Sequence, residues 1–287
     1  MGADLLQDPE VVALADRCSQ GVDLHHLLTA ADDEELRLTQ NAQPALCFAG
    51  IGLTMLLRRA GVEPAAAAGH SVGEYAALAA AGVLAPEVAV RAVTERGLAM
   101  AEAVPAGETS MAAVLGMDPD ALARALEGVQ EAWPANFNTP SQTVIGGSVL
   151  GLAQATEKLQ AAGARRVIPL NVSAAFHTPF VVPAARRLRA FLDTLPFNQP
   201  RIPVISNLSG KPYDDGADFP ALLELQLQSV VRWSDGIRAL HALGITDFVE
   251  VGPKKALSGM IRDLAPGSGA HSVATRAACL EVAGLLH

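Results

Sequence analysis

A serine between two glycines is the first candidate nucleophile of this chain. Gly69-His70-Ser71-Val72-Gly73 fits the pattern G-x-S-x-G, follows a short run of alanines and precedes an alanine-rich helical stretch. Such a serine, at a sharp turn from a strand into a helix, is exposed, and the glycines let neighbouring segments approach it. The N–H groups at the start of the helix point to the place where an oxyanion forms. The pattern predicts attack on an acyl group.

A serine hydroxyl at neutral pH needs a base within hydrogen-bond reach, and the histidines are the candidates. His177 is the preferred one, because it lies in a predicted loop where functional side chains gather, although a plain loop histidine stays open as the alternative. His70 adjoins the serine, but neighbours at a sharp turn point in different directions, so a structural role is expected. The other histidines are expected to be solvated or structural: His25, His26, His241, His271 and His287.

The composition limits the classes of protein. Half of the 287 residues are hydrophobic and only 4% are aromatic, which favours helices packed on a sheet. A net charge of −9 argues against nucleic-acid binding. Cys18, Cys47 and Cys279 form neither a metal-ligand pattern nor a disulfide framework. We expect no metal, no cofactor, no membrane segment, a cytoplasmic location and a monomer.

Hydrophobic periodicity predicts an α/β chain with an inserted module. Helices are predicted at 9–18, 44–60, 72–81 and from 86 onward, with a short buried strand at 65–69. Residues 110–171 read strand, helix, two strands, helix, strand, which is the ferredoxin-like order. After it we predict helices at 179–195, 219–230, 235–243 and 255–264, and strands at 202–206 and 247–251. The predicted division is a large subdomain of residues 1–109 and 172–287 and a small subdomain of residues 110–171.

Several segments carry a resemblance to a known family. These are Gly69 to Tyr75, Glu95-Arg96-Gly97, Asn136-Phe137-Asn138-Thr139-Pro140, Ala175-Phe176-His177 and Glu250-Val251-Gly252-Pro253. In order and spacing they closely resemble the malonyl-CoA:acyl carrier protein transacylase family, from about residue 5 to residue 264. The resemblance implies a parallel-sheet, hydrolase-like large subdomain with an inserted ferredoxin-like subdomain.

The same resemblance implies a reaction with two half-reactions on one serine. Ser71 takes a malonyl group from malonyl-CoA and passes it to the phosphopantetheine thiol of acyl carrier protein. His177 moves the protons, the backbone carbonyl of Gln226 orients His177, and the N–H of Val72 contacts the oxyanion. Fatty-acid and polyketide pathways both stay open.

Arg96 is the predicted selectivity element, because a planar guanidinium can hold the malonyl carboxylate with two parallel hydrogen bonds. The alternative is an arginine on a helix face, paired with Glu95 or Glu102. By the resemblance, Phe176 narrows the space beside the α-carbon of the acyl group. Four further residues match positions that line or brace the acyl pocket, and for them a structural role is equally open: Gln43, Met100, Asn136 and Asn138.

Acyl carrier protein is acidic, as this chain is, so docking is expected to use local basic clusters. The candidates are Arg58-Arg59, Arg165-Arg166, Arg186-Arg187-Arg189 and Lys254-Lys255, and for each of them a solvated face is the alternative.

The chain departs from the family pattern at two places. Lys254 stands where the family has glycine. The sequence starts with Met1-Gly2-Ala3-Asp4, which resembles the segment just after the family's first strand and its Gly-Gln-Gly-Ser-Gln turn. That turn gives the family a second oxyanion donor, and losing such a donor costs on the order of 100 to 1000-fold in rate. We therefore expect the family's first strand to be missing and the chain as given to be poorly active or unstable.

Two other functions stay open. A serine thioesterase or other hydrolase would use the same serine and histidine, but it needs neither Arg96 nor the inserted module. A non-catalytic module that binds carrier protein would follow from loss of the oxyanion turn.

Overall fold

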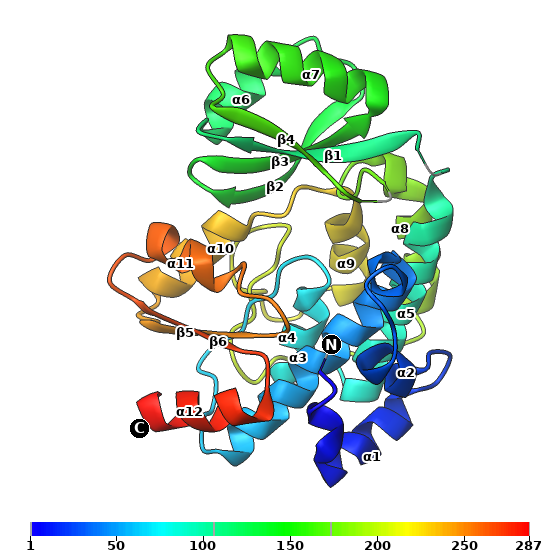
Figure 1. Cartoon of the computed structure of the whole chain (residues 1–287), viewed down its shortest axis with the longest axis vertical. Coiled ribbons are helices and arrows are strands. Elements are labelled where there is room, and N and C mark those ends of the chain that lie inside the picture. The colour runs from blue at the N-terminus through cyan, green and yellow to red at the C-terminus, as the bar shows by residue number, and fades with distance from the viewer. Residues whose placement is uncertain (1, 106, 173, 287) are drawn as a thin grey trace.

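The computed structural model describes residues 2–105, 107–172 and 174–286. Figure 1 shows an antiparallel sheet, which has four strands, with α6 and α7 on its outer face, standing above a larger, helix-rich body. The upper part contains β1 (Thr109–Leu115), α6 (Pro119–Ala125), β2 (Ala132–Thr139), β3 (Gln142–Ser148), α7 (Val149–Ala161) and β4 (Arg166–Leu170). The strands lie in the antiparallel order β2-β3-β1-β4. The predicted succession of strands and helices is present here.

The small sheet has two different faces because its strands alternate inward and outward side chains. On the outer face, Leu122 and Leu159 from the helices pack with Ile145 of β3 in one apolar cluster. On the opposite face, Met111, Ala135 and Val144 form a second cluster, against which Phe176 packs. The second cluster therefore places the loop that follows β4 beneath the sheet.

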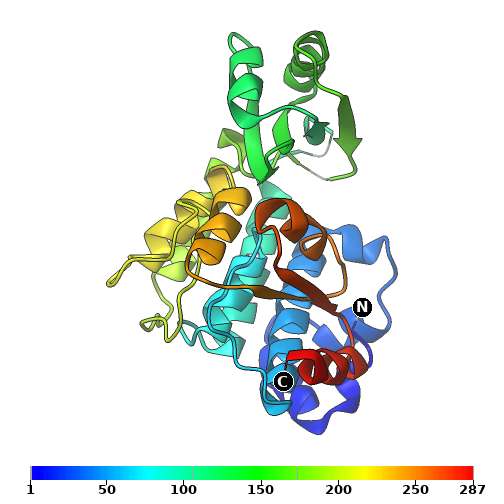
Figure 2. The same ribbon diagram turned by 90° about the vertical axis from the view of Figure 1, so that its left-hand side faces the viewer.

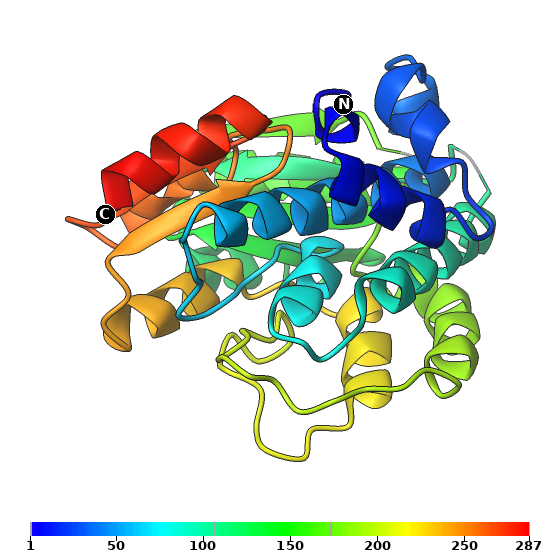
Figure 3. The same ribbon diagram turned by 90° about the horizontal axis from the view of Figure 1, so that it is seen from below.

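The larger body is built mainly of helices, with α3 at its centre. Their bounds are α1 (Pro9–Cys18), α2 (Leu24–Thr29), α3 (Thr39–Arg59), α4 (Gly73–Ala80), α5 (Pro86–Ala103), α8 (Val182–Leu192), α9 (Phe219–Gln228), α10 (Trp233–Ala242), α11 (Ser258–Leu264) and α12 (Arg276–Leu286). Figure 3 shows α3 running through the middle of the body, with α12 on one side and α4 and α5 on the other. The predicted start of α3 at Pro44 is wrong, because the helix begins at Thr39 and includes the proline. The sequence patterns also missed α12.

The parallel sheet is smaller than predicted. Among the described residues, parallel strands pair only in β5 (Asp247–Val251) and β6 (Gly269–Val273), and β6 was not predicted. Figure 2 shows this pair between α11 and α12. The predicted strands at 65–69 and 202–206 are wrong as strands, since they meet in one parallel bridge, Ala67 to Val204.

Residues 65–69 have a backbone partner on one side only, unlike the buried strand that the sequence predicts. This stretch is hydrogen-bonded to the Val204 segment on one side. On the other side lies a cavity of about 780 Å³, which is also lined by β5 and by α3. Within the described ranges, no backbone hydrogen bond crosses from residues 65–69 to β5. With one hydrogen-bonded side and a cavity on the other, the stretch forms a single bridge in place of a strand ladder.

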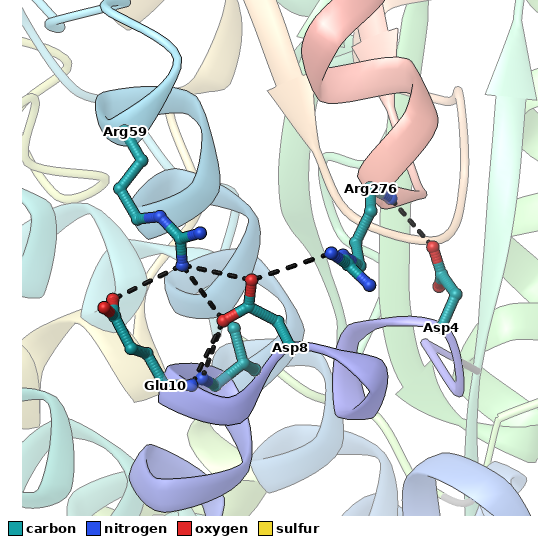
Figure 4. A network of polar contacts seen from close by, with 6 residues as sticks. Asp4, Asp8, Glu10, Arg59 and Arg276 are labelled. Carbon is teal, nitrogen blue, oxygen red and sulfur yellow. Dashed lines mark hydrogen bonds and ion pairs between the residues drawn. The ribbon is translucent and has the colours of Figure 1, made fainter.

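The N-terminal segment is attached to the body by a polar network (Figure 4). Asp8, which is 2% exposed, accepts hydrogen bonds from the N–H groups of Glu10 and Val11 at the start of α1. Its carboxylate also pairs with Arg59 of α3 at 3.0 Å and with Arg276 of α12 at 3.7 Å. Despite the opposing effect of burial, these hydrogen bonds hold the pKa of Asp8 below its ordinary value.

We predict that Asp8→Ala destabilises the protein by roughly 2 to 4 kcal/mol, because it removes a helix cap and leaves Arg59 without its buried partner. The matched change Glu10→Ala removes an exposed partner of the same arginine and is expected to cost about 1 kcal/mol or less. Urea unfolding curves of both variants measure the difference. Equal midpoints for the two variants contradict the prediction.

No helix among the described residues is long and apolar enough to cross a membrane. Cys18, Cys47 and Cys279 are buried free thiols.

Candidate active site

Ser71 lies at the turn between residues 65–69 and α4, as the sequence pattern predicts. Its φ of 52° is in the left-handed region, which is uncommon for a residue other than glycine. Gly69 makes the turn possible: a Cβ added there overlaps the backbone carbonyl of Gly73. A Cβ added at Gly73 meets nothing within 4 Å. The two glycines of the pattern therefore have different structural roles.

This difference gives a prediction. We expect Gly69→Ala to force the turn apart and to lower both stability and acyl transfer, whereas Gly73→Ala is expected to fold with a melting temperature close to that of the parent. Thermal unfolding monitored by circular dichroism provides the comparison. If Gly69→Ala and Gly73→Ala have the same melting temperature, the close contact at Gly69 does not constrain the turn.

The structure brings Ser71 and His177 together, although they are 106 residues apart in the sequence. The Nε2 atom of His177 lies 2.7 Å from Ser71 Oγ, and Nδ1 lies 3.0 Å from the backbone carbonyl oxygen of Gln226. A carbonyl oxygen only accepts, so Nδ1 carries the proton and Nε2 is free to accept the serine proton. This is the orientation that a general base requires.

The loop after β4 fixes His177 in place. Ala175 N–H donates to Thr109 Oγ1 of β1, and Thr178 Oγ1 donates to the carbonyl of Ala175. His177 itself has a left-handed φ of 60° and is 4% exposed. Burial lowers the pKa of His177 to about 3, and the nearby charge of Arg96 adds to the effect. The imidazole is therefore neutral near pH 7.

Arg96 of α5 is a buried cation beside the serine. It is 1% exposed, its Nη1 donates to Gln43 Oε1 at 2.5 Å, and its Nη2 donates to Ser71 Oγ at 3.0 Å. Gly97 permits the close approach of α5 to α3, because a Cβ there would lie 2.8 Å from the Cα of Gln40 on α3. Burial lowers the pKa of Arg96, but a guanidinium stays charged in proteins.

The alternative pairing of Arg96 with acids on its own helix is wrong. Glu95 and Glu102 both pair with Arg187 of α8, at 2.7 and 2.6 Å. Among described residues, no carboxylate lies within ion-pair distance of Arg96, and its Nε has no hydrogen-bond partner. A buried cation without a carboxylate partner is suited to receive one from a ligand.

The other predicted pocket residues fall into two groups. Gln43 and Met100 lie with Arg96, since Gln43 Nε2 donates to Met100 Sδ at 3.2 Å and to Thr39 Oγ1. Asn138 instead contacts His70, whose Nε2 lies 3.0 Å from Asn138 Oδ1 and whose ring packs against Trp233. These contacts agree with a structural role for His70.

Asn136, Phe176 and Val72 lie near the site in different ways. Asn136 pairs with Val231 in a parallel bridge that joins β2 to the body. Phe176, next to His177, is half-buried and packs against the underside of the small sheet. The N–H of Val72, just after Ser71, donates to no described residue, and Val72 lines the large cavity.

Sequence reasoning missed three polar residues beneath Ser71: Glu74, Asn207 and Tyr213. Glu74 belongs to the serine motif, but Asn207 and Tyr213 come from an irregular segment with no distinctive pattern. A glutamate three residues after the candidate nucleophile, at the start of an alanine-rich helix, was the available signal.

The basic clusters differ in how free their charges are. Arg58 and Arg59 pair with Glu63, Asp8 and Glu10. Arg187 and Arg189 pair with acids of this chain as well. The pairs 165–166 and 254–255, in contrast, make no ion pair with any described residue.

The fold and the serine–histidine geometry are those of an acyl-transferring enzyme, and comparison with known proteins gives the class. The family model described as the acyl transferase domain matches residues 1–281, so the chain belongs to this family.

Within the family, the chain is similar to malonyl CoA-acyl carrier protein transacylases. It is 42% identical over 269 residues to the one from Bacillus subtilis (strain 168), covering 91% of this chain and 85% of the relative. It is 38% identical to the one from Escherichia coli (strain K12), with 91% and 87% covered. These relatives confirm the resemblance that the sequence motifs indicate.

Solved structures give the same result. A crystal structure of MCAT from Streptococcus pneumoniae matches with a TM-score of 0.94 and 35% identity, covering 99% of this chain and 95% of that one. A type II PKS acyl-carrier protein in complex with its malonyl-transacylase matches with a TM-score of 0.93 and 33% identity, with 99% and 94% covered. The α/β fold class is confirmed.

Proposed function

We propose that this chain transfers a malonyl group from malonyl-CoA to the phosphopantetheine thiol of acyl carrier protein through an acyl-enzyme on Ser71. One observation carries the proposal: His177 Nε2 lies 2.7 Å and Arg96 Nη2 lies 3.0 Å from Ser71 Oγ. The base and the cation that can bind the free carboxylate therefore both contact the nucleophilic oxygen. The names of the relatives agree with this reaction.

The first half-reaction forms the acyl-enzyme. Ser71 Oγ attacks the thioester carbonyl while its proton passes to His177 Nε2, and the N–H of Val72 donates to the oxyanion. The carbonyl of Gln226 stabilises the imidazolium that forms, because it accepts from Nδ1. When the C–S bond breaks, the proton moves from Nε2 to the departing thiolate of coenzyme A.

The second half-reaction runs the same steps with a new thiol. The phosphopantetheine thiol gives its proton to His177 Nε2 and attacks the malonyl ester, and Ser71 leaves with that proton. One serine and one histidine serve both substrates, so ping-pong kinetics are expected.

The acyl pocket selects by charge. The guanidinium of Arg96 holds the malonyl carboxylate, while Gln43 and Met100 hold Arg96 in place and Phe176 limits the width beside the acyl α-carbon. Asn138 acts indirectly, through His70. An acetyl group leaves the buried cation unpaired, which disfavours its transfer.

The setting of the enzyme is part of the proposal. The division into residues 1–109 with 172–287 and residues 110–171 places the site between two subdomains. Its three free thiols suit a reducing compartment, and we assign the protein to the cytoplasm.

Intact mass measurement after incubation with malonyl-CoA tests the proposal. A malonyl adduct is expected on the parent and not on Ser71→Ala, and it should disappear when acyl carrier protein bearing phosphopantetheine is added. The same experiment with acetyl-CoA and methylmalonyl-CoA is expected to give less adduct. Release of free malonate faster than transfer assigns a hydrolase instead, and the absence of an acyl adduct on Ser71 of the parent favours a binding module.

A further inference from the structure

Glu74 is a buried acid that the two half-reactions do not use. It lies in the first turn of α4, directly after the serine turn, and is 0% exposed. Its Oε1 accepts from the backbone N–H of Asn207 at 3.1 Å and from Tyr213 Oη–H at 2.6 Å, and its Oε2 accepts from Gln226 Nε2 at 3.0 Å. An acid at the start of a helix is already stabilised by the helix dipole, which does not require any of these three donors.

Two of the three residues bound to Glu74, Asn207 and Gln226, also hold the backbone of Ser71. Ser71 N–H donates to Asn207 Oδ1 at 2.7 Å, and Gln226 Nε2 donates to the carbonyl of Ser71 at 2.9 Å. Asn207 Nδ2 also donates to the carbonyl of Gly69 at 2.7 Å. Both polar groups of the left-handed residue are thus fixed by side chains from distant segments.

We propose that Glu74 is a positioning residue, which through Asn207 and Gln226 holds Ser71 in its left-handed conformation with Oγ directed at His177 Nε2. The proposal rests on the proposed malonyl transfer. Gln226 connects the two partners, since its side chain binds Glu74 and Ser71 while its backbone carbonyl binds His177. One carboxylate therefore fixes the nucleophile and, through Gln226, the residue that orients the base.

The arrangement requires a carboxylate rather than an amide. Donors approach both oxygens of Glu74, one from Gln226 and two from the other side. Glutamine at this position has one acceptor oxygen, so its NH₂ group faces a donor in either orientation. Burial raises the pKa of Glu74 to about 7, whereas the three hydrogen bonds and Arg96 favour the charged form, so the carboxylate is the form present above that pH. In Glu74→Gln, the NH₂ group repels the donor that it faces. This repulsion displaces Gln226 or Asn207, and with it Ser71.

Glu74→Gln is the main test, read out as single-turnover malonylation of Ser71 by intact mass across a range of malonyl-CoA concentrations. We expect the maximum rate to fall roughly 10 to 100-fold, since small displacements of reacting atoms cost about this much, while the half-saturating concentration stays within about twofold. Glu157→Gln, an exposed site on α7, is the matched control and is expected to retain the parent rate.

Two further variants separate positioning from general stability. Asn207→Ala leaves Glu74 in place but removes the acceptor of Ser71 N–H, and we expect a similar fall in maximum rate. Tyr213→Phe removes one donor to Glu74 that has no link to Ser71, so it is expected to lower the melting temperature more than the rate. If Glu74→Gln does not fold, Asn207→Ala decides by the same measurement.

A fluorophosphonate probe, which reacts with activated serines without a malonyl group, separates this proposal from the proposed function. A parent enzyme that reacts with the probe but takes no malonyl group overturns the function only, and the loss of probe labelling in Glu74→Gln then supports the positioning role. Acylation and labelling of folded Glu74→Gln at the parent rate overturn the positioning role.

Discussion

His177→Ala is expected to slow malonylation of Ser71 by roughly 100 to 10,000-fold, because no other base lies within hydrogen-bond distance of the serine oxygen in the described structure. Arg96 is the other group that contacts Ser71 Oγ, and as a cation it cannot accept the proton. Rapid-quench mass measurement with saturating malonyl-CoA gives the rate. Substrate binding is expected to change little, since His177 contacts the reacting atoms rather than the carboxylate.

The same variant is expected to change how stability depends on pH. The folded protein keeps His177 neutral down to about pH 3, whereas an unfolded histidine binds a proton near pH 6.5. Between these values the unfolded state holds more protons, so stability is fully present above pH 6.5 and is lost as the pH falls toward 3. His177→Ala lacks this contribution.

Urea unfolding of the parent and of His177→Ala between pH 4 and pH 7.5 measures the effect. The unfolding free energy of the parent minus that of His177→Ala is expected to rise by about 1.4 kcal/mol for each pH unit from pH 4 to pH 6.5. Above pH 6.5 the difference is expected to stay constant. His25→Ala, at an exposed position, is the control. A difference that does not vary with pH shows that the buried histidine is not held neutral.

Arg96→Ala is expected to lower kcat/KM for malonyl-CoA by roughly 30 to 5000-fold, which corresponds to the 2 to 5 kcal/mol lost when one partner of a buried charge pair is removed. Arg96→Lys is expected to recover only part of this, because an ammonium cannot form two parallel bonds to a carboxylate. Steady-state rates with malonyl-CoA and acetyl-CoA provide the measurement.

Acetyl-CoA is the internal control for this variant, because it has no carboxylate for Arg96 to bind. The malonyl-to-acetyl preference is therefore expected to fall, whereas damage to the serine turn would lower both rates together. Arg187→Ala removes an exposed arginine that pairs with Glu95 and Glu102 and is expected to change the preference little. An unchanged preference in Arg96→Ala removes Arg96 from carboxylate recognition.

Local sequence patterns predicted the elements of this protein where the pattern depends on nearby residues. The helix at 9–18 and the strand-helix succession at 110–171 follow from apolar periodicity and turn residues, which act over a few positions. The sequence misplaces the start of α3 because a proline often begins a helix, whereas here the packed helix includes Pro44. The strand at 65–69 failed because a strand also needs partners, which periodicity does not report.

The candidate site divides in the same way. Ser71 is recognisable from its own glycines, and the motifs in register indicate His177, Arg96 and Gln226 from the sequence alone. The tertiary structure alone decided that Arg96 leaves Glu95 and Glu102 to Arg187 and donates to Ser71 instead. It also decided that Asn207 and Gln226 converge on Glu74, since those contacts join residues more than 130 positions apart.

The sequence by itself thus determined the chemistry present: a serine in a glycine turn, a histidine in a loop, an arginine on a helix and the family to which they belong. The tertiary structure determined their protonation and geometry, because burial and distance, rather than residue type, hold His177 neutral and keep Ser71 in its left-handed conformation.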